Sequence, residues 1–440
     1  MRTKSSFLVR STASVLAIAL AAGFSCSAQA QDNVGASESG GGGDVIVTGS
    51  RIRRPADFDT SSPLVSVTAQ SIEQAGSTNV TDFLSRFPAL QSSSLSADNA
   101  GDRGSIGTTG QNLLDLRNLG PQRTLVLING RRHVGGVAGE GSVDINTIPS
   151  DLIERVDVLT GGESTVYGAD AVSGVVNFVM KDNFEGLRTR MQAGTSRYGD
   201  ASQRLISITG GLNFGDGRGN VAFSYEHSEE DRLSSHQRAW LRGSNKVGFY
   251  LNPDDPENQR GYDGPASNGI PDNIPLKDMR YFDTNREGGI DIDYDGYPDY
   301  FVGTGGVLTR FDPGRFIPNS YQQGGNGTLA SDYGTDLLPS VNRNIFNAMM
   351  HYDFTPGLTL FAEGKYARTR SFTFSQPSWD YYLDIKPDNP YLPAEALAAN
   401  EAATASGVCD DPDTPEVEPC YMLMNRDNFD FGRRGENIDR

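Results

Sequence analysis

Residues 116–132 read LRNLGPQRTLVLINGRR, and residues 153–178 read IERVDVLTGGESTVYGADAVSGVVNF. In the first stretch, Leu125 to Ile128 form a short and fully apolar run, which is typical of a strand buried on both faces. The Asn-Gly pair at 129–130 follows this run and is the strongest two-residue signal for a hairpin turn. In the second stretch, valines alternate with polar residues, as in a half-buried strand. The two stretches predict a small mixed domain of strands and short helices.

The pattern from residue 64 to about 181 is α+β throughout. Asn79 is placed to cap a short helix, and Pro88 is placed to end it. Two Gly-rich polar loops, Ala97 to Gln111 and His133 to Asp144, lie between the apolar runs. Such loops suit either a ligand-facing surface or plain connection, and the sequence leaves both open.

From Gly186 onward the pattern changes to longer strands in which apolar and polar residues alternate. The apolar positions are Leu187, Met191, Ala193, Ile206, Ile208, Leu212, Phe214, Val221, Phe223, Tyr225, Phe346, Ala348, Met350, Tyr352, Leu360, Ala362, Gly364 and Tyr366. Short turns such as residues 215–220 and long loops separate the strands, which is the signature of an antiparallel transmembrane β-barrel. A soluble β-sandwich shares the alternation, but its loops rarely run as long as residues 230–342. We interpret that stretch as one very long loop with at most local structure.

The N-terminus has the three parts of a secretory signal. Basic residues stand at Arg2 and Lys4, an apolar run follows at 15–22, and Ala28 to Ala30 form a cleavage site. The apolar run is shorter than the roughly 20 residues of a membrane-spanning helix. We expect export, with a membrane anchor or a lipoprotein attached through Cys26 as minor alternatives.

A flexible Gly/Ser-rich tether at 31–43 precedes the β-prone run Asp44 to Gly49. This run suits strand addition to the sheet of a partner, or it is the first strand of the next domain.

The composition excludes two function classes. The formal net charge of −18 and the pI near 4.7 leave no basic surface for a nucleic acid. Among the 4 histidines there is no metalloprotease helix motif, and the chain has no nucleophile elbow or phosphate loop, so we do not expect an enzyme or a required cofactor.

Two features fall in the region of long loops. Cys409 and Cys420 lie in a polar stretch and would form a disulfide in an oxidising compartment. Asp291, Asp293, Asp295 and Asp299 follow the spacing at the front of a calcium loop, with Gly296 at the sixth position. Position twelve is Val302 rather than the bidentate Glu, so a calcium site and ordinary acidic turns fit equally well.

The two stretches quoted first closely resemble the plug signatures of TonB-dependent outer-membrane receptors. The resemblance covers about residues 44 to 230. It implies a plug inside a barrel of about 22 strands, of which this chain would hold only the first. It divides the chain into a signal peptide (1–30), a linker (31–43), a TonB box (44–49), a plug domain (50–182) and an incomplete N-terminal part of the barrel (183–440).

The resemblance also implies a location, partners and an activity. Members lie in the lipid of the outer membrane of Gram-negative bacteria and take up solutes with work supplied by TonB, ExbB and ExbD. TonB would pair with Asp44, Val45, Ile46, Val47 and Thr48. The solute would be a small molecule or an oligosaccharide, and iron chelates are not assumed.

Several residues match plug positions with expected roles. Arg117 and Arg155 stand where plug arginines pair with barrel glutamates, although a solvated arginine is the simpler alternative. The usual Gly after the first arginine is Asn118, and residues 160–162 replace Arg-Gly-Pro, so one usual charge is missing. We further expect solute contacts from Arg103, Gln111 and His133.

Two other functions remain as alternatives. A surface signalling receptor of this family carries an extra periplasmic domain before the TonB box, and only about a dozen residues separate Ala30 from Asp44. A non-transporting outer-membrane barrel would need no TonB box.

Overall fold

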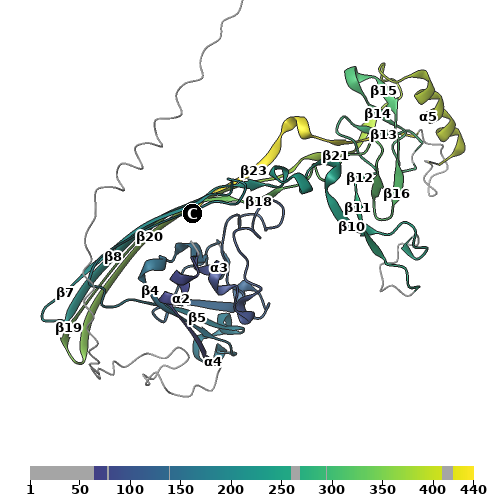
Figure 1. Cartoon of the computed structure of the whole chain (residues 1–440). Coiled ribbons are helices and arrows are strands. Elements are labelled where there is room, and N and C mark those ends of the chain that lie inside the picture. Colours follow the sequence, from purple (N-terminus) through teal and green to yellow (C-terminus); the bar gives the residue numbers. More distant parts are fainter. Residues whose placement is uncertain (1–63, 77–78, 138, 259–267, 294, 409–419) are drawn as a thin grey trace, which may run out of the picture.

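The structure is a computed structural model of the chain and describes residues 64–76, 79–137, 139–258, 268–293, 295–408 and 420–440. The described chain has three parts (Figure 1). We call them the plug domain (residues 64–182), the large sheet, and the distal unit, which consists of the described residues of 231–339 and 378–432. The predicted signal peptide, linker and TonB box lie outside the described residues.

The plug domain is built on a five-stranded sheet with the order β1-β4-β5-β2-β3. Its strands are β1 (Leu64–Thr68), β2 (Thr124–Ile128), β3 (Arg131–Arg132), β4 (Ile153–Leu159) and β5 (Gly174–Met180). Strands β2 and β5 are parallel and the other pairs are antiparallel. The side chains of β2 alternate between two apolar clusters, with Val126 in one and Leu125 and Leu127 in the other. The prediction of a strand buried on both faces is therefore confirmed.

Short helices cover one face of this sheet. Helix α2 (Ala69–Gln74) begins after Thr68, and α3 (Val80–Leu84) begins after Asn79, whose side chain accepts a hydrogen bond from the backbone N–H of Thr81 at 2.8 Å. This contact confirms Asn79 as the helix cap. Helix α4 (Ser164–Tyr167) lies between β4 and β5.

The predicted hairpin turn is also present. Asn129 and Gly130 both have positive φ, +49° and +76°, as a turn between two tightly connected strands requires.

The large sheet has six antiparallel strands in the order β23-β20-β19-β8-β7-β6. Their bounds are β6 (Gly186–Gly194), β7 (Gln203–Phe214), β8 (Gly219–Glu230), β19 (Ser340–Thr355), β20 (Leu358–Pro377) and β23 (Arg433–Asp439). Several are as long as or longer than the 9–11 residues of a transmembrane strand. Within the described residues the first strand, β6, and the last, β23, do not pair, so the sheet is open.

The register places the predicted apolar positions of neighbouring strands on one face. Phe346 pairs with Tyr366 on one side and with Tyr225 on the other. This face is exposed: Leu187 is 73% and Met191 is 79% accessible. The opposite face carries small polar residues such as Ser207, Thr209 and Ser224, which are fully buried. The alternation predicted from the sequence is thus observed, with the apolar side chains pointing away from the plug domain.

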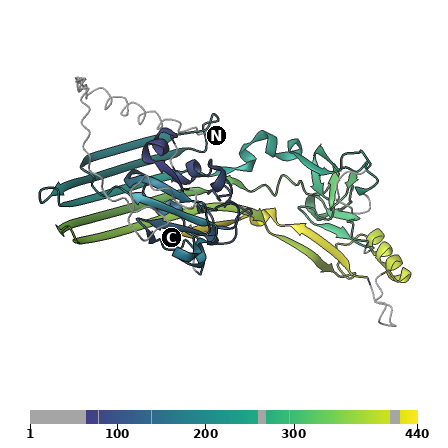
Figure 2. The same ribbon diagram turned by 90° about the horizontal axis from the view of Figure 1, so that it is seen from below.

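The large sheet curves around the plug domain, which lies against its concave face (Figures 1 and 2). Short turns at 215–218 and 356–357 connect strands at one end of the sheet. The long segments that form the distal unit leave from the other end.

The distal unit corrects our interpretation of residues 230–342 as a long loop with at most local structure. Strand β13 (Gly289–Asp291) pairs with β22 (Met422–Asp427), which is more than a hundred residues away in the sequence. A five-stranded sheet with the order β15-β14-β13-β22-β21 therefore joins both long segments. The remaining strands of this sheet are β14 (Tyr300–Val302), β15 (Leu308–Arg310) and β21 (Trp379–Ile385).

An apolar cluster explains why these segments fold together. Ile290, Ile292 and Tyr300 bury against Met422 and against Ala396 of helix α5 (Ala394–Ser406). Most strands here have only three residues, which is too short for the alternation that identifies strands in a sequence. The other short strands are β9 (Leu233–Ser234), β10 (Val247–Leu251), β11 (Asn273–Lys277), β12 (Met279–Tyr281), β16 (Arg315–Ile317), β17 (Tyr321–Gln323) and β18 (Asp336–Leu338).

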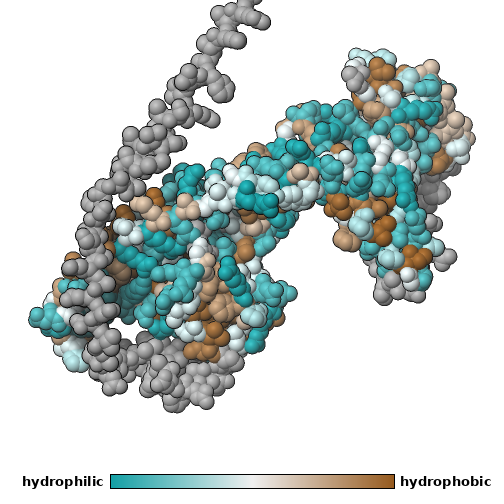
Figure 3. Space-filling model, in the orientation of Figure 1, coloured by the Kyte–Doolittle hydropathy of each residue, from teal (hydrophilic) through white to brown (hydrophobic). Residues whose placement is uncertain are grey.

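Surface hydropathy varies along the molecule. Figure 3 shows hydrophobic residues on the distal unit where β10, β11 and β12 lie. Phe249 of β10 is 76% accessible. No helix in the described part of the chain is long and apolar enough to cross a membrane.

Candidate functional site

The candidate functional site is the interface between the plug domain and the concave face of the large sheet. The first group of contacts lies at the turn before β4. Glu226 of β8 accepts hydrogen bonds from the backbone N–H of Ser150 at 3.1 Å and from its hydroxyl at 2.8 Å. Asp151 accepts a hydrogen bond from Ser207 and forms an ion pair with Arg190 at 3.4 Å. Because Glu226 and Asp151 are both buried, these partners offset the loss of water around the carboxylates.

A second group centres on Arg343 of β19, which is 3% accessible. Its Nη1 donates to the side-chain oxygen of Asn146 in the plug domain at 3.1 Å, and its Nε donates to Ser228 at 2.7 Å. A 3.5 Å ion pair with Glu230 completes the group. Asn146 donates in turn to the carbonyl of Gly110, so one sheet arginine reaches the polar centre of the plug domain.

The Gly-rich loop at 97–111 is held against the sheet over much of its length. Its backbone N–H at Gly101 donates to the Thr373 hydroxyl at 2.8 Å, and its carbonyl at Thr109 accepts from the Ser371 hydroxyl at 2.6 Å. Arg103 donates to the carbonyl oxygens of Asp336 and Leu337, both at 2.8 Å. The loop is therefore hydrogen-bonded to the large sheet and to the distal unit, and it does more than connect two elements of the plug domain.

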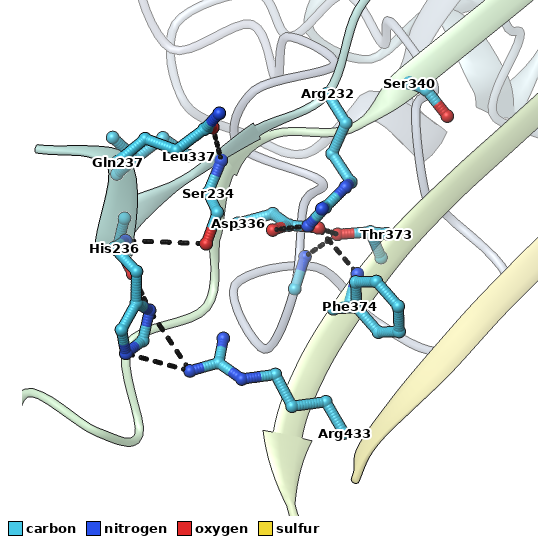
Figure 4. Close-up of polar contacts among 12 residues, drawn as sticks. Arg232, Ser234, His236, Gln237, Asp336, Leu337, Ser340, Thr373, Phe374 and Arg433 are labelled. Atoms are coloured by element: carbon cyan, nitrogen blue, oxygen red, sulfur yellow. Dashed lines mark hydrogen bonds and ion pairs between the residues drawn. The ribbon is translucent and has the colours of Figure 1, made fainter. Parts of the chain in front are cut away.

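The loop meets the base of the distal unit at Asp336 (Figure 4). The carboxylate of Asp336 is buried and accepts from Arg232 at 2.6 Å, from the backbone N–H of Phe374 at 2.6 Å and from Thr373 at 3.2 Å. Thr373 therefore bridges Asp336 and Gly101. One buried carboxylate thus links the distal unit, β20 and, through Thr373, the plug domain.

His236 and Arg433 form a neighbouring contact (Figure 4). One guanidinium nitrogen of Arg433 lies 3.1 Å from both ring nitrogens of His236 and donates to the carbonyl of Asp332 at 2.9 Å. Burial and the charge of Arg433 lower the pKa of His236. The ring is accordingly neutral near pH 7, which is compatible with the adjacent guanidinium.

A cavity of about 590 Å³ lies between the plug hairpin β2–β3 and strands β19 and β20. His133, Asp144 and Thr147 line it from the plug domain, and Glu363 and Lys365 line it from β20. Its volume is within the range of small-molecule sites, about 300–1,000 Å³. The interface therefore contains space for a solute as well as direct contacts.

The structure separates the three residues expected to contact a solute. His133 lines the cavity, Arg103 is bound to carbonyls of the distal unit, and Gln111 is fully buried with its amide donating to the Gly136 carbonyl at 2.9 Å. These residues do not converge on one space. Their solute contacts remain predictions.

The two expected latch arginines have partners inside the plug domain. Arg117 donates to the carbonyl of Thr160 at 2.6 Å, and Arg155 forms an ion pair with Asp157 at 3.3 Å. In the described parts of the chain neither has a hydrogen bond or an ion pair with the large sheet. Asn118, which stands where Gly is usual, has a φ of +57°, a conformation that Asn tolerates better than most residues. The latch to barrel glutamates remains a prediction.

Sequence reasoning missed the residues that do join the two parts. Ser150, Asp151 and Asn146 carry no motif. Glu226 and Arg343 could have been found, because both are large charged residues at inward positions of alternating strands.

The acidic cluster and the cysteines lie in the distal unit. Asp291, Asp293 and Asp299 have carboxylate oxygens within 4.8 Å of one another, whereas Asp295 accepts a hydrogen bond from the backbone N–H of Tyr297 and is not in this group. Burial raises the pKa of Asp299, as do the charges of Asp293 and Asp295. Cys420 is buried and disulfide-bonded, and Cys409 lies outside the described residues. Calcium binding and the Cys409–Cys420 pairing remain predictions.

Comparison with known proteins identifies the domain at this interface. Residues 56–175 match the family model of the TonB-dependent Receptor Plug Domain. The vitamin B12 transporter BtuB of Vibrio cholerae serotype O1 is 29% identical over 183 residues, which cover 41% of this chain and 27% of that transporter. The chain thus spans about a quarter of the length of the curated relatives that it matches.

Solved structures show a weaker likeness. A mutant of the ferric enterobactin receptor PfeA of Pseudomonas aeruginosa has a TM-score of 0.36 and 14% identity over 72% of this chain and 34% of its own. The siderophore receptor PiuA of Acinetobacter baumannii has a TM-score of 0.34 and 16% identity, over 73% of this chain and 38% of its own.

In the structure a small α+β domain packs against the concave face of an antiparallel sheet. Residues 56–175 correspond to a TonB-dependent receptor plug domain, which confirms the resemblance drawn from the two quoted stretches. An α+β domain followed by antiparallel strands agrees with the expected fold class.

Proposed function

We propose that this chain belongs to an outer-membrane transporter of a Gram-negative bacterium that takes up a solute with work supplied through TonB. The observation that carries the proposal is the two-faced sheet. One face presents Leu187, Met191 and Leu360, each more than half exposed, and the other holds a plug domain through buried polar contacts. An apolar outer face and a polar inner face are what a membrane-embedded barrel wall requires.

The coupling to TonB rests on the position of Asp44 to Thr48 between a tether and the plug domain. A short β-prone segment with free edges can pair with a strand of a periplasmic partner through main-chain hydrogen bonds. TonB would pull on this segment, and ExbB and ExbD would supply the work. Rearrangement of the plug domain would then open a path along the interface that holds the cavity.

Growth tests the transport proposal without knowledge of the solute. A strain that lacks this receptor, a strain that lacks TonB and the parent are grown with limiting amounts of single carbon and metal sources. We expect at least one source on which both deletions grow slowly and the receptor gene on a plasmid restores growth only where TonB is present. Restoration in the strain without TonB would contradict the proposal.

A further inference from the structure

The cavity between the plug hairpin and strand β20 contains a cation without a matching anion. Lys365 points from β20 toward the plug domain, and its ammonium donates to Nε2 of His133 at 2.6 Å and approaches the Thr147 hydroxyl at 3.4 Å. Among the described residues no carboxylate lies within ion-pair distance of it. Lys365 is solvent-exposed in this part of the chain, and an ionisable residue on the inner wall of a membrane protein is a candidate functional group.

His133 does not neutralise this charge. Its Nδ1 lies 2.9 Å from the carbonyl of Val134, which requires the proton on Nδ1 and leaves Nε2 as the acceptor for Lys365. Burial and the charge of Lys365 lower the pKa of His133, in agreement with a neutral ring. The imidazole therefore orients the ammonium, which keeps a further N–H for another acceptor.

Asp144 supplies an unused acceptor in the same cavity. Its Oδ1 accepts from the backbone N–H groups of Asn112 and Asn146, both at 3.1 Å. Its Oδ2 is buried and has no hydrogen-bond partner among the described residues, although Asp144 is only 2% accessible. A buried acceptor without a partner is costly, so the cavity favours a ligand that brings a hydroxyl donor.

The remaining lining sets the overall character of the ligand. Arg131 and Glu363 neutralise each other in a 2.8 Å ion pair, and Arg132 pairs with Asp170 outside the cavity. Lys365 and Arg440 then stand against Asp144 alone, which gives a cationic surplus in a chain whose net charge is −18. Ile128, Val134, Met349 and Ala367 add apolar surface for a carbon skeleton.

We propose that this cavity binds a hydroxylated organic carboxylate, such as a sugar acid, with Lys365 on the carboxylate and Asp144 Oδ2 accepting from a hydroxyl. The proposal deepens the proposed function, since it names the class of solute that the transporter passes along the interface. Lys365 would be the residue that selects an anion over a neutral sugar.

Calorimetric titration of the purified full-length receptor with D-glucuronate and with D-glucose tests the proposal. The two probes share a hydroxylated ring and differ in the carboxylate. We expect the wild-type receptor to bind glucuronate at least tenfold more tightly than glucose. Lys365→Met should remove that preference and Lys365→Arg should keep it. Lys386→Met makes the same chemical change on an exposed lysine of the distal unit and should leave the preference intact.

Equal affinity of the wild-type receptor for both probes would overturn the proposal, as would an undiminished preference in a folded Lys365→Met variant. If Lys365→Met does not fold, the proposal is still tested by the affinities of the wild-type receptor and of Lys365→Arg for the two probes: a preference for glucuronate in both supports it, and equal affinities in the wild type overturn it. Binding to purified receptor needs no TonB, so a negative result here leaves TonB-dependent uptake standing, and loss of TonB dependence leaves this binding site standing.

Discussion

Arg343 of β19 donates a 3.1 Å hydrogen bond to Asn146 and thereby places a sheet guanidinium at the polar centre of the plug domain. The same side chain pairs with Glu230 and is almost fully buried. Removal of one partner from a buried ion pair leaves the other charge unpaired, which costs about 3–5 kcal/mol.

We therefore expect Arg343→Met to loosen the plug domain in the full-length receptor. The variant should lose heat stability in detergent and should expose the plug domain to protease. Arg368→Met provides the matched control, because Arg368 pairs with Asp439 on the exposed part of the sheet, and solvent screens pairs of that kind so that they contribute little to stability. Equal protease resistance of Arg343→Met and wild type would show that this contact does not hold the plug domain.

Gly174 should tolerate no side chain. It begins β5 with a φ of +142°, and an added Cβ would lie 2.2 Å from the carbonyl oxygen of Leu159 on the neighbouring strand. Strain of this kind costs of order 1–3 kcal/mol before the clash with the backbone is counted. Gly174→Ala should lower the midpoint of thermal unfolding and the yield of folded receptor. Gly162→Ala is the control, since its Cβ would meet only ordinary contact at 3.7 Å. Similar midpoints for both variants would refute the prediction.

The distal unit should be less stable at pH 7 than at pH 5. Burial raises the pKa of Asp427 to about 6, so the folded state binds a proton that the unfolded state has already released at that pH. The stability from this proton is present below the unfolded pKa of about 3.9 and is lost as the pH rises through 6.

Tryptophan fluorescence of a protein of residues 1–440 during denaturation reports on this region, because the two tryptophans of these residues, Trp240 and Trp379, lie in the distal unit. Trp379 is the cross-strand partner of Asp427. Asp427→Asn should abolish the difference between the two pH values. A wild-type midpoint that rises from pH 5 to pH 7, or a variant with the wild-type pH dependence, would be inconsistent with this assignment.

Calcium binding to Asp291, Asp293 and Asp299 remains our prediction for the distal unit. Millimolar calcium should raise the thermal midpoint of the fluorescence transition, and Asp293→Asn should abolish the increase. The effect should weaken as the pH falls, because the raised pKa of Asp299 lets a proton compete with the metal. Asp295→Asn is the control, since Asp295 lies outside the carboxylate group. Identical midpoints with calcium and with chelator in wild-type receptor would leave only acidic turns.

The sequence predicted those parts of the fold whose local signals agree with their tertiary environment. The strand at 124–128, the cap at Asn79, the turn at 129–130 and the outer face of the large sheet all belong to this class. The distal unit was missed because its sheet depends on pairing between Gly289 and Asn425, and such distant contacts leave no periodic trace in short strands. Arg103 was predicted as a solute contact, whereas in the structure its guanidinium donates to two main-chain carbonyls.

Energised uptake depends on coupling to TonB through residues 44–49, which lie outside the described residues. Strand addition uses the backbone, so a side-chain change should matter little, whereas proline removes an N–H donor and fixes φ. The direct measurement is uptake of the solute identified by the growth screen, in cells that carry the full-length receptor with Val47→Pro or Val47→Ala at matched surface abundance. We expect Val47→Pro to abolish energised uptake while solute binding at the cell surface persists, and Val47→Ala to retain most of the wild-type rate. Wild-type uptake by the Val47→Pro receptor would contradict the account.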